Sequence, residues 1–211
     1  MSNWFALGRY KKAGALASAI VLADRLYDLE AASTATGIAL PATDANALLN
    51  AWDEAEPKLA AIAAALPATG LAPLDAKPAL PFAPGRLFCT ASNYVEHANE
   101  MQTALAAKAD SYPYIFLKSP SAAIGPEEQV LVPYEVTQPD WEVELGVVIG
   151  RPGRRISVEQ ARAHVAGYVV FNDVSARNKI HRTDFPFKHD WFGCKSYDSF
   201  APIGPWLVPD R

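Results

Sequence analysis

Cysteine is scarce in this chain, and long basic or apolar runs are missing from it. Its 211 residues include two cysteines, Cys89 and Cys194, which lie far apart and outside any Cys-x-x-Cys spacing. This excludes a disulfide framework and a cysteine zinc site, and a reducing cytoplasm is the expected location. A net charge of −4 without a basic run argues against nucleic acid or an anionic membrane surface as the main partner. A small-molecule substrate fits this composition better.

The N-terminal segment shares one feature with secretion signals. Lys11 and Lys12 precede the apolar residues 13–23, in the order of the first two regions of a signal peptide. The stretch runs straight into residues 24–29, where apolar and polar residues alternate as in strands, and no polar cleavage region intervenes. We therefore expect strands here and no signal peptide. No apolar stretch reaches the roughly 18 to 20 residues that a membrane span needs.

What the chain does contain divides it into three parts. Half of the residues are apolar, which is enough for a sizeable core. Residues 1–66 predict a small α+β domain that opens with short strands and continues in a helix over residues 44–66, interrupted at Pro57. Five prolines make residues 67–85 an expected extended linker. A second domain over residues 86–211 gives the chain an α+β fold that is mainly β. Its strands are predicted at residues 86–89, 114–117, 140–150 and 167–171.

The most informative motif is a pair of glutamates one residue apart. Glu142 and Glu144 lie in an apolar run, and side chains along a strand alternate faces, so both carboxylates point the same way, roughly 6 to 7 Å apart. Trp141, Val143 and Leu145 are then predicted to point the other way, into a core. Two like charges this close are unfavourable unless a cation lies between them, and hard cations such as Mg²⁺, Mn²⁺ or Ca²⁺ take carboxylate oxygens. The alternative is a solvated polar strand face.

A second candidate site lies on a predicted helix. Asn93 followed by Glu96 resembles a capping box, so a helix is expected to start near Tyr94. His97 and Glu100 would then share one face at positions i and i+3. A carboxylate beside an imidazole raises its basicity and fixes its tautomer, which a general base near neutral pH requires. A surface ion pair is the alternative.

A third polar pair follows the last predicted strand. Residues 167–171 lead into Asn172 and Asp173, which places Asp173 at a strand terminus. Loops at strand ends often carry ligands and catalytic groups. Capping of a turn is the alternative for an Asn-Asp pair.

Five blocks of sequence together resemble the fumarylacetoacetate hydrolase family. They cover roughly residues 86–208 in the family's order, whereas the first 80 residues match only loosely, as expected for that family's variable small domain. The resemblance implies a mixed, mainly β roll and a homodimer. The blocks are Asn93-Tyr94-x-x-His97-x-x-Glu100-Met101, Phe116-Leu117-Lys118, Asp140-Trp141-Glu142-Val143-Glu144-Leu145, Asn172-Asp173-Val174-Ser175-Ala176-Arg177 and Lys195-Ser196-Tyr197-Asp198-x-Phe200-Ala201-Pro202-Ile203-Gly204-Pro205-Trp206.

The resemblance also implies a role for each candidate residue. The ligands of Mg²⁺ or Mn²⁺, with Ca²⁺ as a further candidate, would be Glu142, Glu144 and Asp173. The catalytic residues would be His97, Glu100 and Lys195. The substrate-binding residues would be Tyr94, Lys118 and Arg177. An exposed lysine on a strand is the alternative for Lys118, and Arg177 would pair either with an acidic ligand or with the loop at Asp173.

The implied reaction is hydrolysis of a C–C bond in an acylpyruvate-like 2-oxo acid. The cation would polarise the substrate's oxygens and stabilise an enolate leaving group, while His97 and Glu100 would deprotonate the attacking water. Lys195 would stabilise the oxyanion or help to protonate the product. Decarboxylation, hydration or isomerisation of 2-oxo acids would use the same groups and stays open. Residues 181–191 resemble a lid-side insert whose basic residues suit an anionic substrate, with a solvated loop as the alternative.

Two departures from the family pattern favour a further alternative, a non-catalytic module that keeps the fold. The family usually has glycine before the active-site lysine, whereas Cys194 precedes Lys195 here, which would shift the lysine or crowd the pocket. The family pattern also continues beyond Arg211, through strands that contribute to the substrate site. We therefore expect either a fragment of a longer protein or a shortened chain whose exposed strand edges a partner covers.

Overall fold

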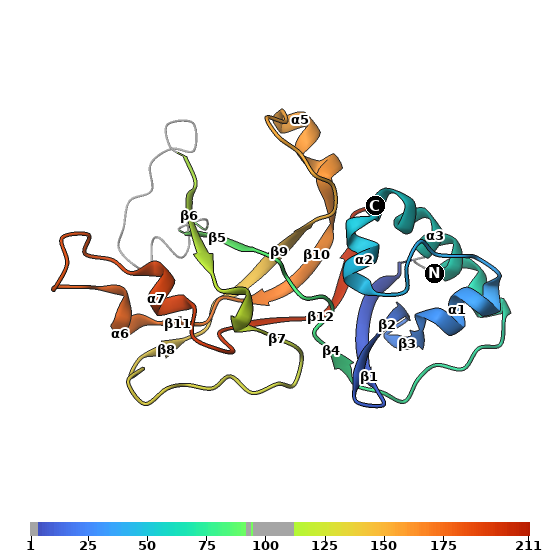
Figure 1. Cartoon of the computed structure of the whole chain (residues 1–211), viewed down its shortest axis with the longest axis horizontal. Helices are drawn as coiled ribbons and strands as arrows, with labels where there is room; N and C mark the ends of the chain where they lie inside the picture. Colours follow the sequence, from blue (N-terminus) through green and yellow to red (C-terminus); the bar gives the residue numbers. More distant parts are fainter. Residues whose placement is uncertain (1–3, 92–93, 95–111) are drawn as a thin grey trace.

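One large sheet organises the protein (Figure 1), in a computed structural model that describes residues 4–91, 94 and 112–211. Its strands are β1 (Ala6–Lys12), β2 (Ala15–Leu22), β3 (Arg25–Asp28), β4 (Pro78–Ala79), β7 (Ala123–Ile124), β9 (Val143–Ile149), β10 (Val165–Asn172) and β12 (Ala201–Pro209). Six of them pair in the order β3-β2-β1-β12-β10-β9, while β4 joins β1 and β7 joins β12. Two smaller ladders stand beside this sheet. They pair β5 (Leu87–Ala91) with β6 (Tyr114–Lys118), and β8 (Pro139–Asp140) with β11 (Ser175–Ala176).

Short helices flank the sheet. On the N-terminal side they are α1 (Leu29–Thr36), α2 (Ala45–Asn50), α3 (Trp52–Ala65) and the 3₁₀ turn η1 (Leu66–Ala68). Further along the chain they are η3 (Pro120–Ala122), α5 (Val158–Ala161), η4 (Arg162–His164), α6 (Arg177–Ile180) and α7 (Trp191–Lys195). Figure 1 shows α6 and α7 on the opposite side of the molecule from α1, α2 and α3. Nowhere in the described ranges is there a helix with the length and hydropathy of a membrane span.

The predicted strands at the N-terminus are confirmed. The stretch that resembles a secretion signal forms the hairpin of β1 and β2, in which Lys11 pairs with Leu16. The hairpin turns at Ala13 and Gly14, which both adopt positive φ, at 49° and 85°. The alternation of residues 24–29 continues into β3, which pairs with β2.

The predicted interruption of the long helix at Pro57 is wrong. The helix breaks at Ala51, whose ψ of 36° separates α2 from α3, and Pro57 lies inside α3. Proline removes one backbone donor and crowds the carbonyl four residues earlier. Here that residue is Asp53, in the first turn of α3, so the missing hydrogen bond lies near the start of the helix.

A single core joins the N-terminal and C-terminal parts. Helical side chains such as Leu48 and Leu59 pack with Leu7 of β1 and, from the other end of the chain, with Phe171 and Leu207. The predicted linker also takes part, because β4 lies within it and pairs with β1. The division at residues 1–66, 67–85 and 86–211 stays a prediction about domains, while the sheet itself crosses those bounds.

The predicted orientation of the glutamate strand is wrong in one respect. Side chains do alternate along β9, but the apolar set faces outward, with Trp141, Val143 and Leu145 exposed by 63 to 70%. Gly146 and Val148 face inward, and a Cβ at Gly146 would come within 2.6 Å of Val169. Glu142 and Glu144 share this inward parity, so they lie toward the interior. The strand composition alone does not show which face the rest of the protein covers, because that depends on the elements packed against the sheet.

Candidate active site

The pairing of β9 with β10 brings three carboxylates to one face of the sheet. Phe171 lies opposite Glu144, and the ladder continues past β10, where the backbone N–H of Asp173 donates to the carbonyl of Glu142 at 2.8 Å. Asn172 secures this end, since its Oδ1 accepts from the N–H of Glu142 at 3.1 Å. Asp173 is two residues after Phe171 and so faces the same way as Glu142 and Glu144. Within the Asn-Asp pair, Asn172 thus holds the backbone of the neighbouring strand through its side chain, and Asp173 is the candidate ligand.

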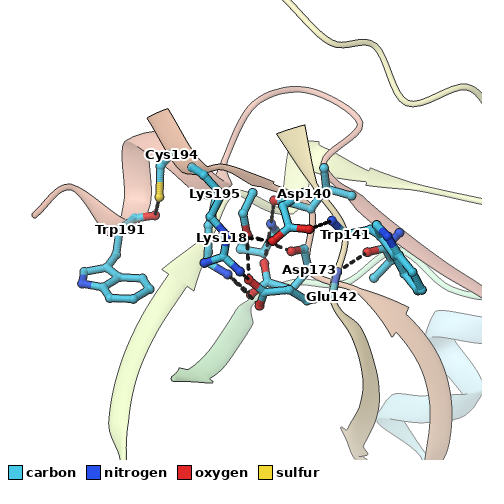
Figure 2. Close-up of polar contacts among 12 residues, drawn as sticks. Lys118, Asp140, Trp141, Glu142, Asp173, Trp191, Cys194 and Lys195 are labelled. Carbon is cyan, nitrogen blue, oxygen red and sulfur yellow. Dashed lines mark hydrogen bonds and ion pairs between the residues drawn. The ribbon is translucent and has the colours of Figure 1, made fainter. Parts of the chain in front are cut away.

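Two buried lysines meet these carboxylates (Figure 2). Lys118 of β6 donates from Nζ to Asp173 Oδ1 at 2.7 Å and to the carbonyl of Val174 at 2.9 Å. Lys195 of α7 donates from Nζ to Asp173 Oδ2 at 2.6 Å and to Glu142 Oε2 at 3.0 Å. Each lysine is only 2% exposed. The alternative of an exposed Lys118 is therefore wrong.

Burial and charge act in opposite directions on Lys118. Burial lowers the pKa of Lys118 from its ordinary value, because it removes water from the ammonium, and the negative charge and hydrogen bond of Asp173 raise it in part. The ion pair accounts for the presence of a lysine here, since charged side chains are almost never fully buried unless paired.

The helix that carries Lys195 is fixed at both of its ends. Asp190 caps it, accepting a hydrogen bond from the N–H of Gly193 at 2.7 Å. Cys194 is fully buried in a second core that includes Val174 and Phe200, and its Sγ donates to the carbonyl of Trp191 at 3.4 Å. The cysteine that replaces the usual glycine thus occupies the core, and Lys195 still reaches both carboxylates.

Arg177 pairs with two carboxylates of the site, and its predicted contact with substrate stays a prediction. Its guanidinium donates to Glu142 Oε1 at 2.5 Å and to Asp140 Oδ2 at 2.8 Å. Ser175 Oγ also donates to Glu142 Oε1, at 3.2 Å. Asp140 and Ser175 were not predicted as site residues. The sequence does contain a pattern that could have indicated Asp140. Asp140 precedes Glu142 by two residues, so in an extended strand it lies on the same face as Glu142 and Glu144.

The donor chemistry suits a hard divalent cation. Glu142 Oε2 and Asp173 Oδ2 converge on one positive charge, the ammonium of Lys195, and carboxylate oxygens are the ligands that Mg²⁺ and Mn²⁺ prefer. Glu144 is half-buried on the same face. Within the described part of the chain, no three His, Cys, Asp or Glu side chains are arranged to hold a metal ion. A divalent cation at this point would replace the Lys195 ammonium as the shared partner of the two carboxylates.

Both cysteines are held as neutral thiols near this cluster. Burial, with a further contribution from the charge of Asp173, raises the pKa of Cys89 to about 12. Burial likewise raises the pKa of Cys194 to about 11. The thiolate is the reactive form of cysteine, so neither side chain is a nucleophile in this site at neutral pH.

Three of the predicted site residues lie in or next to the stretch between β5 and β6. His97 and Glu100, the predicted catalytic dyad, lie outside the described residues. Tyr94 is described and is 50% exposed, and its predicted contact with substrate stays a prediction.

Comparison with known protein families identifies the family of this chain. The family described as "Fumarylacetoacetate (FAA) hydrolase C-terminal" matches residues 86–211, which is more than half of the chain. The chain belongs to the fumarylacetoacetate hydrolase family. The resemblance stated from its motifs is thereby confirmed, and the expected α+β, mainly β fold of that type is confirmed by the solved structures that it matches.

Relatives within the family carry names of different activities. The chain is 40% identical over 125 residues to human "Oxaloacetate tautomerase FAHD2B, mitochondrial", which spans 59% of this chain and 38% of that protein. It is 41% identical over 129 residues to "2,4-didehydro-3-deoxy-L-rhamnonate hydrolase" of Sphingomonas sp. (strain SKA58), which spans 60% of this chain and 42% of that protein. The chain thus covers about two fifths of the length of these curated relatives.

A solved structure of the family extends over nearly the whole chain. This is 5-carboxymethyl-2-hydroxymuconate delta-isomerase from Mycobacterium smegmatis, with a TM-score of 0.66 and 25% identity, covering 98% of this chain and 66% of that one. The fumarylacetoacetate hydrolase family therefore includes proteins named as hydrolases, isomerases and tautomerases, and family membership alone does not choose among these reactions.

Proposed function

We propose that this protein hydrolyses a C–C bond in a small anionic, acylpyruvate-like 2-oxo acid, with a divalent cation. The observation that carries the proposal is the buried cluster in which Lys118 and Lys195 both contact Asp173, and Lys195 also contacts Glu142. Buried charges are unfavourable even when paired, and clusters of this kind gather at functional sites. A site that combines acidic ligands with two ammonium groups suits both a cation and an anionic substrate.

The proposed ligands of the cation are Glu142, Glu144 and Asp173. When bound, Mg²⁺ or Mn²⁺ would supply Lewis-acid polarisation of the substrate's keto and carboxylate oxygens. Arg177 and Ser175 hold one oxygen of Glu142 and so leave its other oxygen directed into the site. Lys118 orients Asp173 through the oxygen that Lys195 does not use.

The chain's own residues would then carry the proton transfers. His97, oriented by Glu100, is the proposed base that takes a proton from the attacking water. Addition of this water to the distal carbonyl, followed by cleavage of the C–C bond, yields a carboxylic acid and pyruvate from an acylpyruvate. Lys195 donates a hydrogen bond to oxygen that becomes negatively charged along this path, and its burial in a region of low dielectric strengthens that bond.

Tautomerisation of oxaloacetate is the second candidate. It is favoured by the 40% identity to proteins named oxaloacetate tautomerase. This reaction moves a proton between carbon and oxygen and needs no water nucleophile, so the same base and ammonium groups would suffice. Decarboxylation and a non-catalytic role of the module are further outcomes of the same assay.

The deciding experiment compares products. The purified chain is loaded with Mg²⁺ or Mn²⁺ and given acetylpyruvate or oxaloacetate, with EDTA-treated protein and Lys195→Met in parallel. Lys11→Met serves as the control, because Lys11 is exposed at the end of β1. Formation of acetate and pyruvate that is lost with EDTA and with Lys195→Met supports the hydrolase. Interconversion of keto and enol oxaloacetate without acetylpyruvate cleavage selects the tautomerase, and a folded, metal-loaded chain without turnover overturns both.

The partner and the location of the protein belong to the same proposal. The substrate would be a small anionic acid, the protein would act in the cytoplasm, and the homodimer implied by the family resemblance would form in solution. The exposed apolar side chains of β9 support a contact between two copies of the chain, since an exposed edge strand readily pairs with another chain.

A further inference from the structure

Trp191 lies where three parts of the site meet. It opens α7 four residues before Lys195, and this spacing puts both side chains on one face of the helix. Its ring stacks on Phe116 of β6, with centroids 5.4 Å apart and an angle of 29°, and it contacts Tyr114 at 5.6 Å. Trp191 thus lies over β6, the strand that also supplies Lys118.

The ammonium of Lys195 rests against these rings. Its Nζ lies 5.0 Å from the centroid of Phe116 and 6.0 Å from that of Trp191. Both distances are within the range in which a cation is attracted to an aromatic face. The Lys195 ammonium therefore has two kinds of neighbour. It binds the carboxylates of Glu142 and Asp173, and it lies next to the aromatic rings of Phe116 and Trp191.

Trp191 also contacts the loop of residues 181–190. His189 stacks on Trp191, with centroids 6.4 Å apart and an angle of 26°, and His181 lies 4.9 Å from His189. The backbones of these two histidines form an isolated β-bridge, and Arg182 closes the loop through ion pairs with Asp184 and Asp190. These contacts make the segment a hairpin that is closed at His181 and His189, and most of its side chains are exposed. The choice between a lid-side insert and a solvated loop stays a prediction.

This arrangement controls a flexible side chain. Lysine has a four-carbon stem with many rotamers, and the ion pairs fix only its tip. Aromatic rings next to the ammonium restrict the positions open to Nζ and help to keep it buried. Leucine at position 191 would keep an apolar group there but would leave Phe116 and His189 without the ring that joins them.

We propose that Trp191 is a positioning residue that, in the metal-free chain, holds the ammonium of Lys195 between Glu142 and Asp173 and connects it to the hairpin of residues 181–190. The consequence for catalysis rests on the proposed function, whereas the positioning of Lys195 does not. The inference extends the site to a residue that never needs to touch the substrate.

The test measures how accessible Lys195 is in the full chain. Purified protein is labelled with a low concentration of acetic anhydride, and the acetylation rates of Lys195 and of Lys11, an exposed internal reference on β1, are read by mass spectrometry. Trp191→Leu is expected to raise the rate at Lys195 relative to Lys11 by about fivefold or more, as for the loss of a desolvated cation–π contact. Trp191→Phe should restore most of the protection. Phe192→Leu is the matched control, because Phe192 is the next residue and is 55% exposed.

An unchanged rate at Lys195 in folded Trp191→Leu would overturn the proposal. His189→Leu keeps the test decisive if Trp191→Leu does not fold, because His189 is exposed and its loss removes the ring that connects Trp191 to the hairpin. A rate above that of the wild type is expected for His189→Leu, and an unchanged rate would contradict the connection.

Turnover separates this proposal from the proposed function. If the wild type cleaves acetylpyruvate, Trp191→Leu should lower kcat far more than it raises KM, and Trp191→Phe should recover kcat. If the wild type turns over neither acid, the proposed function fails, and the acetylation rates still decide whether Trp191 positions Lys195.

Discussion

Lys195 and Asp173, which are 22 positions apart in the chain, form a buried ion pair with Nζ and Oδ2 separated by 2.6 Å. Lys118 occupies the other oxygen of the same carboxylate, at 2.7 Å. One aspartate thus neutralises parts of two ammonium groups, and Glu142 supplies the remaining partner of Lys195. This shared arrangement makes the cluster sensitive to the loss of any one member.

Lys195→Met should destabilise the metal-free protein by about 3 kcal/mol, because removal of one partner leaves buried carboxylate charge without compensation. Denaturant unfolding with and without Mn²⁺ measures this effect. Added Mn²⁺ should recover more stability in Lys195→Met than in the wild type, since the cation would take over the missing positive charge. Equal stabilisation of both proteins would contradict a shared site for the cation and the ammonium.

Asp173→Asn should lower stability by about 3 to 5 kcal/mol, since it leaves Lys118 and Lys195 without their common carboxylate. Unlike Lys195→Met, this variant should gain nothing from Mn²⁺, because it removes a proposed ligand as well. Asp75→Asn, in the stretch before β4, is the control. Recovery of stability with Mn²⁺ in Asp173→Asn would show that Asp173 is not a ligand.

The thiol of Cys89 gives a pH dependence with a defined sign. Its pKa rises from 9.0 to about 12 in the folded protein, mainly through burial. A group with a raised pKa in the folded state contributes stability that is present below its unfolded pKa and is lost as pH rises toward the folded value. Stability should therefore fall between about pH 9 and pH 12, less steeply in Cys89→Ala. A pH slope in Cys89→Ala equal to that of the wild type would exclude this thiol as the cause.

The exposed face of β9 predicts a change in association. Leu145 is 63% exposed on the edge strand of the sheet, and lysine on an edge strand opposes pairing with another chain. If the proposed homodimer uses this face, Leu145→Lys should shift sedimentation toward the monomer. Leu16→Lys is the control, because Leu16 is 49% exposed on β2, away from this edge. The same sedimentation for wild type and Leu145→Lys would remove β9 from the dimer contact.

Local patterns predicted a large part of the secondary structure. Alternation of apolar and polar residues over residues 24–29 indicated β3, and the apolar run before it was predicted to be strand because no cleavage region follows it. The parity of Glu142 and Glu144 follows from strand geometry alone. The outward orientation of Trp141, Val143 and Leu145 could not be predicted in the same way, because it depends on which face of the sheet the rest of the protein covers. The position of the helix break also could not be predicted, since α3 accommodates Pro57 in its interior and Ala51 carries no breaking signal.

The composition of the site needed tertiary information. The motif at Asp173 marked a candidate ligand, but its contacts with Lys118 and Lys195 join β6, the end of β10 and α7. Trp191 carried no signal of its own, because its position over Phe116 and beside His189 depends on the packing of α7. In contrast, the two-residue spacing of Asp140, Glu142 and Glu144 was present in the sequence and places Asp140, the second partner of Arg177, on the same face as the two glutamates.

The most direct test of the account is calorimetric titration of the purified chain with Mn²⁺, comparing the wild type with Glu144→Gln. Glu30→Gln is the control, because Glu30 lies in the first turn of α1, apart from the proposed ligands. The account predicts one Mn²⁺ bound per chain by the wild type and by Glu30→Gln, and binding lost or weakened severely in Glu144→Gln. A folded wild-type chain that binds no Mn²⁺, or a Glu144→Gln variant that binds it as the wild type does, would contradict the three-carboxylate site.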